Sequence, residues 1–151
     1  MPFVLIHGAT FGAGAWGRLI SLLADDVLAV DLPGRGARAH VDLRGVTLGG
    51  CAQAAADDIV QRDLSDIVLV AHSFGGAVAP GVMSLVPDRI RQVVLLSGVV
   101  PDDGAPVVSC IDARLKRALE ASTVGVSTPP VTKRPRAACA TTETTIRSNT
   151  S

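Results

Sequence analysis

The chain has 151 residues, 48% of them hydrophobic, and its 14 Lys and Arg balance 14 Asp and Glu to a formal net charge of zero. This length predicts one globular domain, and the absence of a basic block argues against a nucleic-acid partner. The three cysteines are far apart and form no C-x-x-C pair, which argues against a disulfide framework and a zinc site. We therefore expect no metal and no cofactor.

The apolar stretches give no sign of a targeting or membrane segment. The first residues, MPFVLIHGAT, lack the basic residues that begin a signal peptide and lead directly into a predicted strand. The run VVLLSGVV is much shorter than the ~20 apolar residues that a membrane-spanning helix needs. We expect a soluble, cytoplasmic protein with no membrane partner.

Four short apolar runs have the length and composition of β-strands. They are Phe3–Ile6, Val27–Val30, Ile67–Ser73 and Val93–Val100. The last two are apolar almost without interruption, which is typical of strands buried on both faces of a parallel sheet. The first two end in the turn sequences HG and DLPGRG. This pattern predicts a mainly parallel sheet of about four strands.

Segments with helical spacing lie between these runs. The spacing predicts helices over Trp16–Ala24, Leu48–Leu64 and Gly76–Val86. Strands that alternate with helices indicate an α/β fold with right-handed crossovers.

The alternation stops after residue 106, so we assign residues 1–106 to the α/β fold. Residues 107–121 contain one candidate amphipathic helix, Ile111–Ala121. Residues 122–151 are rich in Thr, Ser, Pro and Ala without either period, and we predict that they form a disordered tail.

A serine lies at the corner between the third strand and the helix that follows it. The sequence Ala71-x-Ser73-x-Gly75 fits the G-x-S-x-G nucleophile elbow with Ala at its first position. A turn this sharp needs a positive φ at Ser73 and small residues at Ala71 and Gly75. It would present the hydroxyl beside the N–H of Phe74, at the start of the helix, where an oxyanion can be stabilised. The alternative is that Ser73 only caps the helix.

The loop after the first strand offers a second oxyanion donor. In LIHGATFGAGAW, a turn rich in glycine and alanine would let the N–H of Ala9 face the same point. We expect His7 to brace this loop rather than act as a base. His72 points to the opposite side of its strand from Ser73, because side chains alternate along a strand, so we expect a packed histidine.

Together these motifs resemble the amino-terminal half of an α/β-hydrolase. Within that superfamily they are most similar to the esterase and hydroxynitrile-lyase branch that includes plant methyl-ester esterases. The residues that carry the resemblance are HGATFGAGAW, DLPGRG, VTLGGCAQAAADDIV, AHSFGG and PDDG, from Pro2 to Gly104. It implies that Ser73 is the nucleophile, that Ala9 and Phe74 donate to the oxyanion, and that the strands lie in the order second, first, third, fourth. That order would put a ligand crevice between the first and third strands.

The base that such a serine needs is missing from the downstream sequence. The order in α/β-hydrolases is Ser, then Asp or Glu, then His, yet His7, His40 and His72 all precede Ser73. Asp102 and Asp103 follow the fourth strand and could supply an acid, but without a histidine they are better explained as loop residues. We hypothesise that the chain is a truncated or frame-shifted hydrolase.

The sequence therefore predicts a serine hydrolase of esterase type that acts on a small-molecule ester. Lyase chemistry stays open, because the same apparatus in the resembled branch also cleaves cyanohydrins. The main alternative is a catalytically silent fragment or an interaction protein that lacks the histidine. In either case loss of the later strands would leave VVLLSGVV as an exposed sheet edge, through which the chain could form a homo-dimer. A dinucleotide-binding domain is a weaker alternative, because HGATFGAG lacks the G-x-G-x-x-G order and only Asp31 could contact a ribose.

Overall fold

A five-stranded sheet forms the centre of the computed structural model, which describes residues 1–102, 104–114, 116, 117 and 145–147. Its strands are β1 (Phe3–Ile6), β2 (Val27–Val30), β3 (Ile67–His72), β4 (Ile90–Leu96) and β5 (Thr145–Arg147). The order is β2-β1-β3-β4-β5, and the first four are parallel. The predicted four-stranded parallel sheet and its order are confirmed.

Two ends of the sheet differ from the prediction. β4 begins three residues before the expected Val93 and ends at Leu96, because Ser97 turns the chain with a φ of 45°. β5 was not predicted, and it pairs antiparallel with Gln92–Val94 at the edge of β4. The remainder of the predicted tail lies outside the described residues.

Three α-helices follow β1, β2 and β3 in turn. They are α1 (Gly17–Ile20), α2 (Leu48–Gln61) and α3 (Gly75–Leu85). α1 is shorter than predicted, because a 3-10 helix, Ala13–Trp16, takes up the start of the expected segment. α2 begins where predicted, since the Thr47 side chain accepts from the Gly50 N–H at 3.0 Å and caps it. Short 3-10 helices occupy the loops at Gly36–Arg38, Leu43–Gly45, Pro87–Arg89 and Val107–Cys110.

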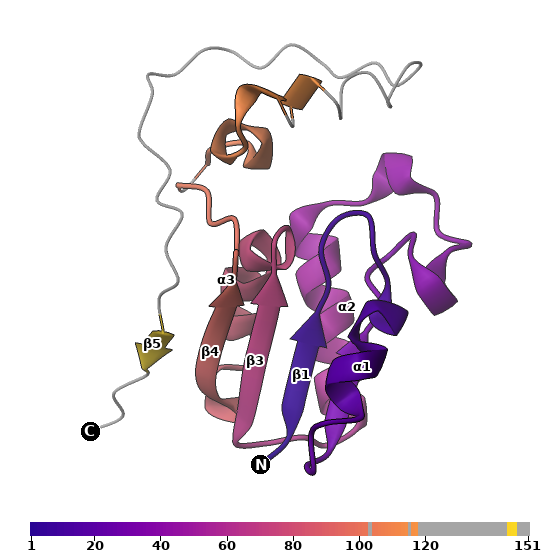
Figure 1. The fold of residues 1–151 in the computed structure, drawn as a ribbon, viewed down its shortest axis with the longest axis vertical. Coiled ribbons are helices and arrows are strands. Elements are labelled where there is room, and N and C mark those ends of the chain that lie inside the picture. Colours follow the sequence, from indigo (N-terminus) through magenta and orange to yellow (C-terminus); the bar gives the residue numbers. More distant parts are fainter. Residues whose placement is uncertain (103, 115, 118–144, 148–151) are drawn as a thin grey trace. The chain divides into compact units, whose positions relative to one another are not determined.

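The sheet separates two apolar clusters, as expected for an α/β fold. On one face Leu5, Val68 and Val70 pack with Trp16 and the α1 side chains. On the other face β-strand residues such as Val4, Ile6 and Leu69 pack against α2 and α3. Figure 1 shows α1 in front of the sheet and α2 and α3 behind it. Because successive side chains along β1 and β3 point to opposite faces, each strand contributes to both clusters, and its sequence is apolar throughout.

The chain divides into two compact units. One comprises Met1–Val99 together with Thr141–Ser151 and holds the whole sheet, and the other spans Val100–Ala140. In the second unit Val107–Cys110 form a 3-10 helix, and Ala113, Arg114, Lys116 and Arg117 are helical. The rest of the helix expected at Ile111–Ala121 falls mostly on residues that are not described. Among the described residues, no helix has the length and apolarity to cross a membrane.

Candidate active site

Ser73 lies in a tight turn between β3 and α3. Its φ is 51°, which is the positive value that the sequence predicted. The neighbouring end of β4 holds this turn from both sides, because the Ser73 N–H donates to the Leu96 carbonyl at 3.1 Å and the Ser73 carbonyl accepts from the Val99 N–H at 2.9 Å. A strained conformation persists only where its surroundings determine it in this way.

The residues around Ser73 have no room for side chains. A Cβ at Gly75 would lie 2.9 Å from the Ile6 carbonyl oxygen, and one at Gly76 would lie 2.8 Å from the Val99 backbone nitrogen. These distances are shorter than real Cβ contacts, and backbone atoms cannot move aside easily. Ala71 is fully buried. The small residues of the motif therefore let α3 begin close against the ends of β1 and β4.

The start of α3 argues against the simple capping role for Ser73. The residue at the helix N-cap is Phe74, and no side-chain capping bond is made there. Within the described part of the chain, the N–H of Phe74 donates to no protein acceptor. The first turn of α3 thus presents an available donor next to Ser73.

The loop after β1 lies directly beside Ser73. A Cβ at Gly8 would stand 3.2 Å from the Ser73 Cβ. The Gly8 carbonyl accepts from the His7 Nδ1 at 2.7 Å and from the Phe11 N–H at 3.2 Å. Ala9, the predicted second donor, follows immediately, and its N–H has no protein acceptor among the described residues.

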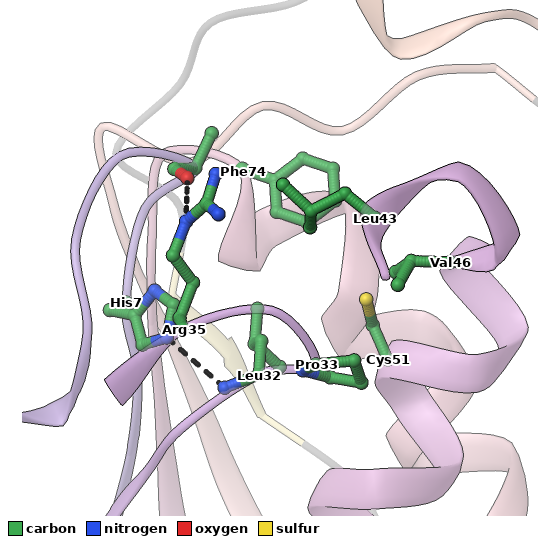
Figure 2. Close-up of a pocket in the computed structure, with 9 residues that line it drawn as sticks. His7, Leu32, Pro33, Arg35, Leu43, Val46, Cys51 and Phe74 are labelled. Atoms are coloured by element: carbon green, nitrogen blue, oxygen red, sulfur yellow. Dashed lines mark hydrogen bonds between the residues drawn. The ribbon is translucent and has the colours of Figure 1, made fainter. Parts of the chain in front are cut away.

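His7 is a structural brace of this loop, as the sequence suggested. It is 1% exposed, and its Nε2 accepts from the Leu32 N–H at 3.1 Å while its Nδ1 donates to Gly8. Figure 2 shows the bond to Leu32. An acceptor at Nε2 and a donor at Nδ1 require the neutral Nδ1–H tautomer. Both nitrogens are engaged, so His7 is not poised to take a proton from Ser73.

The His72 ring packs at 6.3 Å and nearly perpendicular to the Trp16 ring, with Phe11 at 6.2 Å, so it packs against aromatic side chains as expected. A Cβ at Gly8 would lie 3.1 Å from the His72 Nδ1, so this ring also borders the loop beside Ser73. His40 is exposed in the loop after β2. Asp102 is exposed in the second compact unit, and Asp103 lies outside the described residues.

The loop after β2 supplies two residues that the sequence analysis did not assign to the site. The Arg35 Nε donates to the Ala9 carbonyl at 2.8 Å, as Figure 2 shows. The Asp31 carboxylate accepts from the Ala13 N–H at 2.7 Å and from the Ala37 N–H at 2.9 Å. The predicted parallel pairing of β1 and β2 could have indicated these two residues, because it brings HGATFGAGAW and DLPGRG to the same edge of the sheet.

These contacts also change the chemistry of Asp31. Burial by itself would raise the pKa of its carboxyl, but the N–H groups of Ala13 and Ala37, together with the nearby positive charge of Arg38, hold the pKa below its ordinary value. Both oxygens of Asp31 are engaged, which argues against the ribose contact considered for a dinucleotide.

A small pocket of about 120 Å³ opens next to the loop of Ala9. Ala9 and Phe74 line it together, with Leu32, Val46 and Cys51 as apolar walls and Arg35 as its charged residue. Figure 2 shows these side chains around one hollow. Ser73 is not part of the lining, but it directly precedes Phe74. Burial raises the pKa of the Cys51 thiol, so this cysteine forms an apolar wall rather than a reactive group.

Comparison with known proteins shows which family this chain resembles. Residues 3–144 match the Alpha/beta hydrolase family. The chain is 32% identical over 126 residues to the carbendazim hydrolyzing esterase of Nocardioides sp. (strain SG-4G), covering 82% of this chain and 52% of that protein. It is 34% identical over 107 residues to putative methylesterase 11, chloroplastic, of Arabidopsis thaliana, covering 68% of this chain and 27% of that protein.

A solved structure is similar over the same region. The extracellular alpha/beta-hydrolase from a Paenibacillus species superposes with a TM-score of 0.71 and 35% identity, covering 80% of this chain and 50% of that one. The chain thus spans about half the length of such relatives or less. Its motifs, its sheet order and the match over residues 3–144 show that the chain belongs to the alpha/beta hydrolase family.

Proposed function

We propose that the chain carries the nucleophile and the oxyanion hole of a serine esterase that acts on a small-molecule ester. Ser73 is the proposed nucleophile, and the N–H groups of Ala9 and Phe74 are the proposed oxyanion donors. One observation carries the proposal. The turn at Ser73, with its positive φ, lies against Gly8, and the residues that follow Gly8 and Ser73, Ala9 and Phe74, have N–H groups that donate to no protein acceptor among the described residues.

In the proposed reaction the Ser73 Oγ attacks the ester carbonyl carbon while its proton passes to a base. The carbonyl oxygen becomes an oxyanion that accepts from Ala9 and Phe74. The tetrahedral intermediate expels the alcohol, which takes up the proton, and leaves an acyl-enzyme that water hydrolyses to the acid and free Ser73. The apolar pocket next to both donors fits the apolar part of a small ester.

The proposal needs a general base, and none of the three histidines of the chain is assigned to that role. The relatives named above are called esterases, and this chain covers about half of the first of them. Nucleophile and oxyanion donors without a base leave about 10³–10⁴-fold acceleration over water in comparable enzymes, far below full activity. The proposed activity of this chain alone is accordingly low.

The alternative is a catalytically silent member of the family. It is considered because the three histidines of this chain all precede Ser73 and none is assigned as its base. In that case the sheet and the pocket would be retained for binding, without turnover.

A fluorophosphonate probe separates the two proposals, because it phosphonylates an activated serine. Because no base is assigned, we expect slow labelling that reaches one equivalent on the folded protein, at Ser73, and none on the Ser73→Ala variant. Ser97→Ala is the matched control, since Ser97 also has a positive φ at a strand end, and it should label like the wild type. A folded wild-type protein that takes up no label, with circular dichroism as the check on folding, would establish the silent alternative.

A further inference from the structure

We propose that Arg35 is a positioning residue, which holds the peptide after Ala9 and so fixes the backbone at Ala9 with its N–H toward the oxyanion. This inference rests on the proposed function, because it concerns one of the two proposed donors. Among the described residues, the Arg35 side chain forms no hydrogen bond with Ser73. It acts through the carbonyl of Ala9, to which its Nε donates at 2.8 Å.

Two peptide groups flank the Cα of Ala9, and each is held by a different loop. The carbonyl of the Gly8–Ala9 peptide accepts from His7 and Phe11. A trans peptide is planar, so fixing this carbonyl sends the Ala9 N–H in the opposite direction. The next peptide, which carries the Ala9 carbonyl, is held by Arg35. With both planes fixed, the φ and ψ of Ala9 are fixed as well.

Arg35 is itself well held, which a positioning residue requires. Its Nη1 donates to the Gly34 carbonyl at 2.9 Å, so the guanidinium makes two bonds at once. The loop around it turns at Gly34 and Gly36, with φ values of 78° and 48°. A Cβ at Gly36 would lie 2.0 Å from an Asp31 carboxylate oxygen, so the loop closes tightly on that side chain.

A second arginine ties the loop to the body of the fold. Arg38 donates to the Asp31 carbonyl at 2.5 Å and pairs with both carboxylate oxygens of Asp58 on α2, at 2.9 and 2.6 Å. A bidentate pair of this kind fixes geometry as well as charge. Through Arg38 and Asp31, α2 therefore holds the loop that carries Arg35.

The chemistry of the side chain explains why an arginine fits here. The bond to Ala9 comes from Nε, inside the guanidinium plane, while Nη1 serves Gly34. Lysine has one ammonium at the end of a flexible stem and cannot hold both carbonyls in a fixed plane. Arg35→Lys should thus behave more like Arg35→Ala than like the wild type.

The test measures the rate of fluorophosphonate labelling at Ser73, separated into the maximal rate and the probe concentration at half-maximal rate. Losing one oxyanion donor outright costs about 10²–10³-fold in rate, so misplacing one should lower the maximal rate about 10–100-fold. We expect this for Arg35→Ala and Arg35→Lys with the half-maximal concentration unchanged. Arg44→Ala is the matched control, because Arg44 is exposed and, among the described residues, its side chain pairs only with nearby Asp42.

Chemical rescue distinguishes positioning from a general loss of structure. Ethylguanidinium, at concentrations too low to denature, should restore part of the labelling rate of Arg35→Ala and have no effect on Arg44→Ala. Wild-type rates in both Arg35 variants would overturn the inference and leave the proposed function intact.

A wild-type protein that does not label would instead overturn the proposed function. The inference is then decided by hydrogen exchange of the amides from Ala9 to Phe11. Faster exchange in Arg35→Ala than in Arg44→Ala would support the positioning role, and equal exchange would overturn it.

Discussion

Ser73 and Ser97 end neighbouring parallel strands with nearly the same backbone conformation, yet their surroundings differ. Their φ values are 51° and 45°. α3 begins two residues after Ser73, whereas Gly98 and Val99 after Ser97 belong to no helix or strand. Ser73 is half-buried against the loop of β1, and Ser97 is exposed. A positive φ makes the sharp turn in both places, but only a turn that leads into a helix brings N–H groups to the hydroxyl.

The largest expected difference between the two turns concerns their glycines. An alanine at Gly75 would meet the Ile6 backbone at 2.9 Å, while one at Gly98 would meet the Leu95 side chain at 3.1 Å and the Gly76 Cα only at 3.6 Å, an ordinary contact distance. Overpacking costs about 1–3 kcal/mol, and backbone gives way less than a side chain. We expect Gly75→Ala to lose about 3 kcal/mol of unfolding free energy and Gly98→Ala about 1 kcal/mol or less. Urea unfolding with an unchanged slope measures both, and equal losses would contradict the contrast.

The Asp31 carboxylate is a second difference between the surroundings of the two serines, because it supports the loop beside Ser73 and not the turn at Ser97. We expect Asp31→Asn to lower the unfolding free energy at pH 7 by about 1 kcal/mol, since one of its two backbone donors loses a charged acceptor. The pKa of Asp31 is lowered in the folded protein, so the stability it contributes is present above the ordinary value of 3.8 and lost as the pH falls through the folded pKa.

The pH dependence of Asp31 can be checked against a matched exposed carboxylate. The gap in unfolding free energy between wild type and Asp31→Asn should be constant near neutral pH and close below pH 3.8. Asp88→Asn is the control, because Asp88 is exposed and its carboxylate makes no hydrogen bond or ion pair among the described residues. A gap that widens on acidification would show that Asp31 does not act as a carboxylate here.

The smallest expected effect comes from relieving the strain at both serines. Glycine accepts a positive φ freely but loses more chain entropy on folding. We therefore expect Ser73→Gly and Ser97→Gly each to raise the unfolding free energy by about 0.5 kcal/mol. Fluorophosphonate labelling should disappear in the first variant and persist in the second. A loss of stability in Ser73→Gly would mean that its hydroxyl supports the fold.

Much of the fold could be predicted because buried parallel strands are continuous apolar runs. β1 and β2 have the expected bounds, and β3 differs by one residue. β4 was misplaced because only Val93 along it is fully buried, so its first residues, Ile90 to Gln92, did not read as apolar. β5 could not be predicted, since its short polar segment depends on pairing with an existing edge.

The candidate site was predictable only where the local chain determines it. The turn at Ser73 follows from its own neighbours, Ala71 and Gly75. The contacts of Arg35 with Ala9 and of Asp31 with Ala13 join two separate loops, and no local pattern encodes them. Only the pairing of β1 with β2 makes these residues neighbours. The catalytic roles of Ser73, Ala9 and Phe74 stay proposals.

The convergence of strand ends on one serine has a kinetic consequence. Gly8, Leu96 and Val99 contact Ser73 or its turn, and they come from stretches of chain that are far apart in sequence. Such non-local contacts form slowly, because the intervening loops must close before the contacts can stabilise anything. In a partly folded chain, Ser73 would lack its contacts with the Gly8 loop and the end of β4. The reactivity proposed for that hydroxyl would therefore appear with the last step of assembly rather than with the first collapse.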